Sequence, residues 1–338
     1  MKKTVLSCLL LALLPTVSAT AGEVNIYSYR QAYLIEPILA EFTKQTGIKT
    51  NVLFIKDGLA DRLAGEGRHS KADVVLTVDI KRLTELVDKG LAAKVTDPVI
   101  EKNIPARFRD ADGMWFGLTS RARAIYTSKD RVGRLPASFT YMDLTKPELK
   151  GRVCVRSGKH PYNVGLVASM IANHDVAYAR TFLEGLKANL AKKPQGGDRD
   201  QIKSIAAGEC DYALGNSYYF GVMLSDEKQR GPAEQVYINF PNQETTGTHM
   251  NVSGMALAKY APNKADAIRL MQFLSGHSAQ QLYAELNHEY PVEKGVPTSK
   301  LVASWGTFKQ DPIALDKIAD HYAEAIKLID EVQFDLVK

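Results

Sequence analysis

Residues 23–90 alternate between short apolar segments and helical patterns, and this alternation restricts the possible folds more than any other feature of the chain. The segment ADVVLTV, residues 72–78, is apolar almost throughout, as is typical of a parallel strand covered on both faces. In chain order, we expect a strand from 23 into a loop at 30, a helix over 34–45, a strand over 48–55, a helix over 59–64, the strand 72–78 and a helix over 80–89. This order predicts an α/β domain with a parallel sheet.

The chain changes character after residue 97, where a loop-rich segment leads to extended patterns over 115–126 and 251–258. We interpret these two extended segments as crossings between two lobes. The other expected elements are strands over 151–156, 210–214 and 236–240, and helices near 164–173, 175–191, 202–207, 264–274, 279–286 and 311–332.

The sequence therefore predicts an α/β fold of two lobes, each with a central sheet flanked by helices, joined by a hinge. We expect lobe 1 to contain residues 22–124 plus about 250–300. Lobe 2 is expected to contain about 125–249 plus the C-terminal helices over 301–338. Ligands prefer such domain boundaries, and hinge closure is one way to trap them.

The N-terminus has the pattern of a secretory signal peptide. Two lysines precede an apolar run over 5–14, and Ala19-Thr20-Ala21 forms a small-residue cleavage site. The run is shorter than the roughly 20 residues that span a bilayer, and no later stretch is long and apolar enough for a membrane span. We expect residues 1–21 to be removed and the mature chain to be periplasmic; an uncleaved anchor is the alternative.

Charge and cysteine content narrow the function further. The chain has 43 basic and 38 acidic residues, a formal net charge of +5, and no long run of one sign, which argues against nucleic acid as a partner. Cys154 and Cys210 remain after removal of the signal peptide. Because export permits disulfides, we expect these two to be linked; two buried free thiols are the alternative.

No sequence motif indicates catalysis. The chain lacks a phosphate-binding G-x-x-x-x-G-K-[ST] loop, an H-E-x-x-H zinc motif and a G-x-S-x-G nucleophile elbow. The seven histidines are scattered along the chain. We therefore expect a binding protein rather than an enzyme.

Tyrosines gather where predicted strands end. Tyr218 and Tyr219 follow an apolar strand and Ser217, which we expect to be the N-cap of a helix. Tyr162 is expected in a polar loop after another strand, and Tyr29 and Tyr33 lie near the end of the first strand. Ligands of open α/β sheets bind at the carboxyl ends of strands, so these tyrosines are candidates for one cleft. The alternative for each is ordinary packing with the hydroxyl outward.

Several phenols in one cleft suit a hard, strongly acidic cation. Such a cation prefers oxygen ligands, and it can displace the proton of a phenol whose free pKa is about 10. Three phenolates neutralise one Fe³⁺ ion. Stacking of a sugar on the tyrosine rings is the competing use of the same residues.

Four segments carry a resemblance to a known family: Tyr27–Arg30, Gly117–Arg123, Val155–Asn163 and Gly208–Tyr219. They resemble the periplasmic ferric-ion-binding proteins of bacterial ABC importers, and the likeness extends over essentially the whole mature chain. The resemblance implies a transferrin-like periplasmic binding protein of type II-like fold that closes on one Fe³⁺ ion. It further implies that Tyr162, Tyr218 and Tyr219 are ligands and that an inner-membrane ABC permease is the partner; we expect a monomer.

The first lobe departs from the family pattern. Many members carry a histidine just after the Y-S-x-R segment, where this chain has Gln31-Ala32-Tyr33. A fourth tyrosine ligand is then Tyr29 or Tyr33. Some relatives instead use a carbonate-like anion held by arginine, a role that fits Arg30 together with Arg121 or Arg123. The alternative function is a binding protein of the same fold for an organic solute such as a polyamine, thiamine or a sugar.

Overall fold

The computed structural model describes residues 22–336, so the expected signal peptide at 1–21 lies outside the described residues. A first group of elements surrounds the N-terminal strands. It consists of β1 (Glu23–Ser28), α1 (Ala32–Thr46), β2 (Lys49–Phe54), α2 (Leu59–Glu66), η1 (Gly67–His69), β3 (Val74–Thr77), α3 (Ile80–Asp88), β4 (Ala92–Ala93), α4 (Pro98–Asn103), η2 (Ala106–Phe108), α10 (Lys264–Ser275), α11 (His277–Asn287) and β10 (Tyr290–Pro291).

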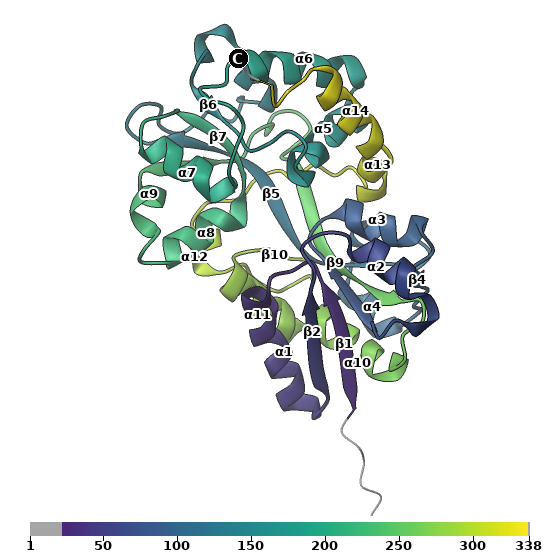
Figure 1. Cartoon of the computed structure of the whole chain (residues 1–338). Helices are drawn as coiled ribbons and strands as arrows, with labels where there is room; N and C mark the ends of the chain where they lie inside the picture. Colours follow the sequence, from purple (N-terminus) through teal and green to yellow (C-terminus); the bar gives the residue numbers. More distant parts are fainter. Residues whose placement is uncertain (1–21, 337–338) are drawn as a thin grey trace, which may run out of the picture.

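A second group of elements lies at the other end of two long strands, β5 (Phe116–Ser128) and β9 (Met250–Ala258) (Figure 1). It consists of η3 (Tyr141–Thr145), η4 (Pro147–Leu149), β6 (Val153–Cys154), α5 (Pro161–Asn173), α6 (Val176–Ala188), α7 (Asp198–Ala206), β7 (Tyr212–Asn216), α8 (Ser217–Ser225), α9 (Arg230–Glu234), β8 (Val236–Asn239), α12 (Lys300–Ala303), α13 (Leu315–Asp320) and α14 (Tyr322–Glu331). Among residues 22–336, no helix is long and apolar enough to cross a membrane.

The sheet passes from one group to the other through β5 and β9. Its strand order is β2-β1-β3-β9-β5-β7-β6, and β4, β8 and β10 pair off this path. The strands β1, β2 and β3 are parallel, as the alternating pattern predicts, whereas β9 and β5 are antiparallel to each other. One half of β5 pairs with β9 and the other half with β7 and β8. A single strand is therefore shared by both groups.

Local sequence explains the helices that cover the sheet. In α1, Ile35, Ile38, Leu39 and Phe42 are buried at helical spacing, and Gly47 ends the helix with a left-handed backbone at φ 72°. A glycine adopts this conformation without the steric cost that a Cβ would bring. The helix predicted over 34–45 is thus confirmed.

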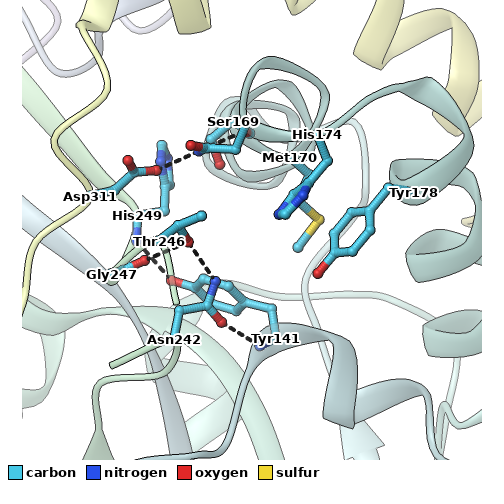
Figure 2. A pocket seen from close by; sticks show the side chains of 11 residues that line it. Tyr141, Ser169, Met170, His174, Tyr178, Asn242, Thr246, Gly247, His249 and Asp311 are labelled. Carbon is cyan, nitrogen blue, oxygen red and sulfur yellow. Dashed lines mark hydrogen bonds between the residues drawn. The ribbon is translucent and has the colours of Figure 1, made fainter. Parts of the chain in front are cut away.

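A buried tyrosine ties the two crossing strands together. The hydroxyl of Tyr141 donates to the carbonyl of Arg123 in β5 at 2.5 Å and accepts from the backbone N–H of His249, next to β9, at 3.2 Å. Tyr141 and His249 also line a cavity of about 10 Å³, together with Asp311 and His174 (Figure 2). Such a cavity has room for about one water molecule.

Three predictions about the elements are wrong. The expected helix over 311–332 is broken into α13 and α14, and the expected strand over 151–156 is only β6. The segment after 97, expected to be loop-rich, begins with the helix α4, because Asp97 caps its first turn by accepting Val99 N–H and Ile100 N–H. Short elements of this kind depend on tertiary contacts more than on local pattern.

Cys154 in β6 and Cys210, just before β7, form a disulfide with Cα atoms 5.9 Å apart, and both cysteines are buried. Replacing either residue by serine should lower the free energy of unfolding by about 2–5 kcal/mol, because a crosslink that closes a long loop restricts the unfolded chain. Thermal melting measures the loss. Mass spectrometry of the unreduced protein should find both cysteines in one linked peptide pair. Full alkylation of both thiols without reductant would contradict the prediction.

Candidate metal centre

Two helix N-termini carry the tyrosines singled out by the sequence. Tyr162 is the second residue of α5, and Tyr218 and Tyr219 follow Ser217, the first residue of α8. The expectation that Tyr162 lies in a loop is therefore wrong. Pro161 is favourable at the first helical position, and the helix begins there because the Nδ1 atom of His160 accepts the Tyr162 backbone N–H at 3.3 Å.

The N-cap of α8 also differs from the prediction. Asn216, not Ser217, occupies the N-cap position. The hydroxyl of Ser217 instead accepts the backbone N–H of Ala122 in β5 at 3.2 Å. This bond fixes the first turn of α8 against the crossing strand, and with it the backbone of Tyr218 and Tyr219.

The three phenols meet at one point. The hydroxyl oxygens of Tyr162 and Tyr218 lie 3.3 Å apart, and the ring centroids of Tyr218 and Tyr219 are 4.1 Å apart. Tyr162 and Tyr218 are buried, and Tyr219 is partly buried. The structure thus brings together three tyrosines that are separated by up to 57 positions, the difference between 162 and 219.

Burial keeps the phenols of Tyr218 and Tyr219 protonated when no cation is bound. Burial, and the neighbouring Tyr162 phenol, raise the pKa of both Tyr218 and Tyr219 above the ordinary value of 10.0. The phenolate is therefore disfavoured unless a positive charge arrives. A strongly acidic cation supplies that charge and displaces the protons.

Guanidinium groups surround the phenols. Arg121 lies 5.7 Å from the ring centroid of Tyr218, and Arg156 lies 5.3 Å from that of Tyr162. Arg199 lies 5.8 Å from the ring centroid of Tyr219. These positive charges, together with the two helix N-termini, favour phenolates. Arg156 and Arg199 were not predicted from the sequence, although Arg156 lies in a segment that carries the family resemblance.

Two of the three expected anion-binding arginines are already paired. Arg30 is buried and donates to both carboxylate oxygens of Glu289, at 2.9 and 3.0 Å. Arg123 donates to Asp198 at 3.1 Å and to Asn163 at 2.6 Å. Internal partners therefore neutralise both side chains.

Arg121 is different. It donates through Nη2 to the Val78 carbonyl at 2.6 Å, and a carboxylate oxygen of Glu289 lies 4.0 Å away. Its Nε and Nη1 atoms are buried and have no hydrogen-bond partner among residues 22–336. Arg121 thus retains two free donors beside Tyr218, whereas Arg123 retains one, its Nε atom, among residues 22–336.

The two first-lobe tyrosines have other surroundings. The hydroxyl of Tyr29 accepts the backbone N–H of Leu59 at 3.1 Å, and the Arg82 guanidinium covers its ring at 3.8 Å. Tyr33, in the first turn of α1, is 54% exposed. Within the described part of the chain, neither Tyr29 nor Tyr33 forms a hydrogen bond or a ring contact with Tyr218, so the structure brings together three of the five candidate tyrosines.

The chain is similar to known proteins over most of its length. A family described as bacterial extracellular solute-binding protein matches residues 69–307. Iron uptake protein A1 of Synechocystis is 43% identical over 91% of this chain and 86% of its own length. The major ferric iron-binding protein of Neisseria meningitidis is 24% identical over 93% and 92%.

Solved structures resemble the chain over nearly its whole length. The apo ferric ion-binding protein A of Pasteurella haemolytica is 61% identical, with a TM-score of 0.91, and the match covers 94% of this chain and 100% of that one. The Trichodesmium protein IdiA (FutA), solved in complex with iron and citrate ligands, is 37% identical with a TM-score of 0.87, over 93% and 100%. The two-lobed periplasmic binding fold predicted from the sequence is confirmed.

Proposed function

Because the chain belongs to the bacterial extracellular solute-binding protein family, we propose that it captures ferric iron in the periplasm and delivers it to an ABC permease. The meeting of Tyr162, Tyr218 and Tyr219 at two helix N-termini is the observation that carries this proposal. Three phenolates neutralise Fe³⁺, and the ferric ion is the cargo of the protein.

The three tyrosines supply three oxygen ligands, and an anion such as carbonate supplies others. Arg121 binds this anion through its unpaired donors. Arg30 and Arg123 influence the anion only indirectly, because the carboxylates of Glu289 and Asp198 hold their guanidinium groups in place. A fourth tyrosine ligand from lobe 1, Tyr29 or Tyr33, stays a prediction.

We propose that lobe 1 contains residues 22–124 with about 250–300, and that lobe 2 contains about 125–249 with 301–338. The tyrosines all belong to lobe 2, so lobe 1 closes over an ion that lobe 2 has bound. The mature protein is a monomer without catalytic activity, and residues 1–21 are cleaved on export. We expect neither a nucleic-acid partner nor a membrane span for the mature protein.

Metal analysis of protein purified without added iron tests the proposal. We expect bound iron and a visible absorption band, since Fe³⁺–phenolate sites absorb visible light, and a strong chelator should bleach the band. Colourless protein that ignores ferric salts but binds a polyamine, thiamine or a sugar would instead support the organic-solute alternative.

A further inference from the structure

The turn between β3 and α3, residues 78–80, is held by both crossing strands. Arg121 of β5 donates to the Val78 carbonyl at 2.6 Å. The backbone N–H of Ile80 donates to Oδ1 of Asn251 in β9 at 3.1 Å. The turn, which belongs to the first group of elements, is therefore anchored where the sheet passes toward the second group.

A tyrosine from the second group reaches the same place. Tyr322 begins α14, which packs against α5. A Cβ atom at Gly165, in α5, would lie 2.7 Å from the Tyr322 hydroxyl and 3.4 Å from Nδ2 of Asn251. The absence of a side chain at Gly165 thus lets the Tyr322 hydroxyl lie close to α5 and to the crossing strand. Elements of both groups meet at this point.

Four buried side chains here have unused hydrogen-bonding atoms. Among residues 22–336, partners are lacking for Oδ2 of Asp79, Nδ2 of Asn251, the hydroxyl of Tyr322 and Nε and Nη1 of Arg121. All four residues are at most 6% exposed. Buried polar groups are rarely left unpaired because each one costs free energy.

The unused atoms are complementary. Oδ2 of Asp79 is available as an acceptor, because the Nε atom of Arg82, its ion-pair partner, lies 3.7 Å away, beyond hydrogen-bond distance, while Oδ1 accepts the Arg82 backbone N–H at 3.0 Å. Burial raises the pKa of Tyr322, and the Asp79 carboxylate raises it further. The Tyr322 hydroxyl therefore keeps its proton at neutral pH and can donate a hydrogen bond. The Tyr322 hydroxyl can therefore serve as the donor and Oδ2 of Asp79 as the acceptor of one hydrogen bond.

We propose that Tyr322 and Asp79 form an interlobe hydrogen bond when the lobes close, and that this bond positions Arg121 at the metal centre. The inference rests on the proposed function. Arg121 connects the two places, because it donates to Val78, next to Asp79, and faces the ring of Tyr218. A bond that exists only in the closed arrangement favours that arrangement and slows release of the ion.

The test measures the rate of iron release to excess EDTA, followed as the loss of visible absorbance. Tyr322→Phe and Asp79→Asn should each release iron about tenfold faster than the wild type, as expected for loss of a bond to a charged group. Asn retains the oxygen that accepts the Arg82 N–H. The double variant should release iron no faster than the faster single variant, because both changes remove one interaction.

Tyr290→Phe is the matched control, since it also removes a buried hydroxyl that has no partner among the described residues, at a position outside this cluster. It should release iron at the wild-type rate. X-ray scattering should give a larger radius of gyration for iron-loaded Tyr322→Phe than for iron-loaded wild type.

Two results would overturn the proposal while leaving the ferric function intact: wild-type release rates in both single variants, or additive effects in the double variant. Wild-type protein that takes up no iron would refute the proposed function, and with it any role of this contact in iron release.

Discussion

Replacing Tyr219 by Phe should lower the affinity for Fe³⁺ by at least about 100-fold, since even partners outside the ligand shell of a metal typically change affinity 10- to 100-fold. The change removes one phenolate and its negative charge but keeps the ring, which packs against Tyr218 at 4.1 Å. The fold should therefore survive, while the visible band shifts or disappears. Tyr218→Phe should have a comparable effect.

Tyr178→Phe is a suitable control for these variants. Tyr178 lies in α6 and lines the small cavity beside Tyr141 and His249 rather than the metal centre (Figure 2). The iron affinity and the visible spectrum of Tyr178→Phe should match those of the wild type. Equilibrium binding in competition with a chelator measures the affinities. Wild-type affinity and colour in both Tyr218→Phe and Tyr219→Phe would remove these two residues from the ligand set.

The largest effect on stability is expected from Asp198→Asn. Asp198 is completely buried and accepts from Arg123 at 3.1 Å, from Arg156 at 3.3 Å and from the backbone N–H of Asn216 at 3.1 Å. Loss of its charge leaves two guanidinium groups without their carboxylate. Breaking a buried pair in this way costs about 3–5 kcal/mol. Thermal or denaturant unfolding measures the loss.

The pH dependence of this contribution follows from the pKa of Asp198. Burial alone would raise the pKa, but Arg123 and Arg156 lower it more, so the folded-state pKa lies below the ordinary value. The carboxylate therefore stabilises the fold fully above a pH of about 4, near the unfolded-state pKa. This stabilisation is lost as the pH falls through the lower folded-state pKa. Asp198→Asn should lack this part of the acid dependence.

Asp320→Asn provides the comparison, because Asp320 is an exposed aspartate that lies 3.8 Å from Lys317. Exposed pairs contribute about 0–1 kcal/mol. Equal stability losses in the Asp198 and Asp320 variants would contradict the view that the buried carboxylate organises the arginines beside the tyrosines.

Periodicity and residue spacing were sufficient for much of the fold. The pattern of α1 and the apolar strand β3 were readable because each buries a whole face or a whole segment, which leaves a local signal. The break at His321 between α13 and α14 could not be predicted, since apolar residues continue at helical spacing on both sides of it. Here tertiary packing overrides local propensity.

The candidate site, too, could be predicted from the sequence only in part. Tyr218 and Tyr219 are neighbours in sequence, and Tyr162 follows Pro161 after a strand, so their positions at strand ends could be inferred. The surroundings of the arginines could not. Arg30 pairs with Glu289, which is 259 positions away, and only the folded chain brings these two residues together.

Counting the protons released when iron binds tests the central claim, coordination of Fe³⁺ by the phenolates of Tyr162, Tyr218 and Tyr219, most directly. Because free phenols titrate at a pKa of about 10, they carry their protons between mildly acidic and neutral pH. We predict about three protons released per ion from the phenols, after correction for the iron chelate used, and about one fewer in Tyr219→Phe. Iron uptake without proton release in this pH range would contradict the account, even if the protein bound iron tightly.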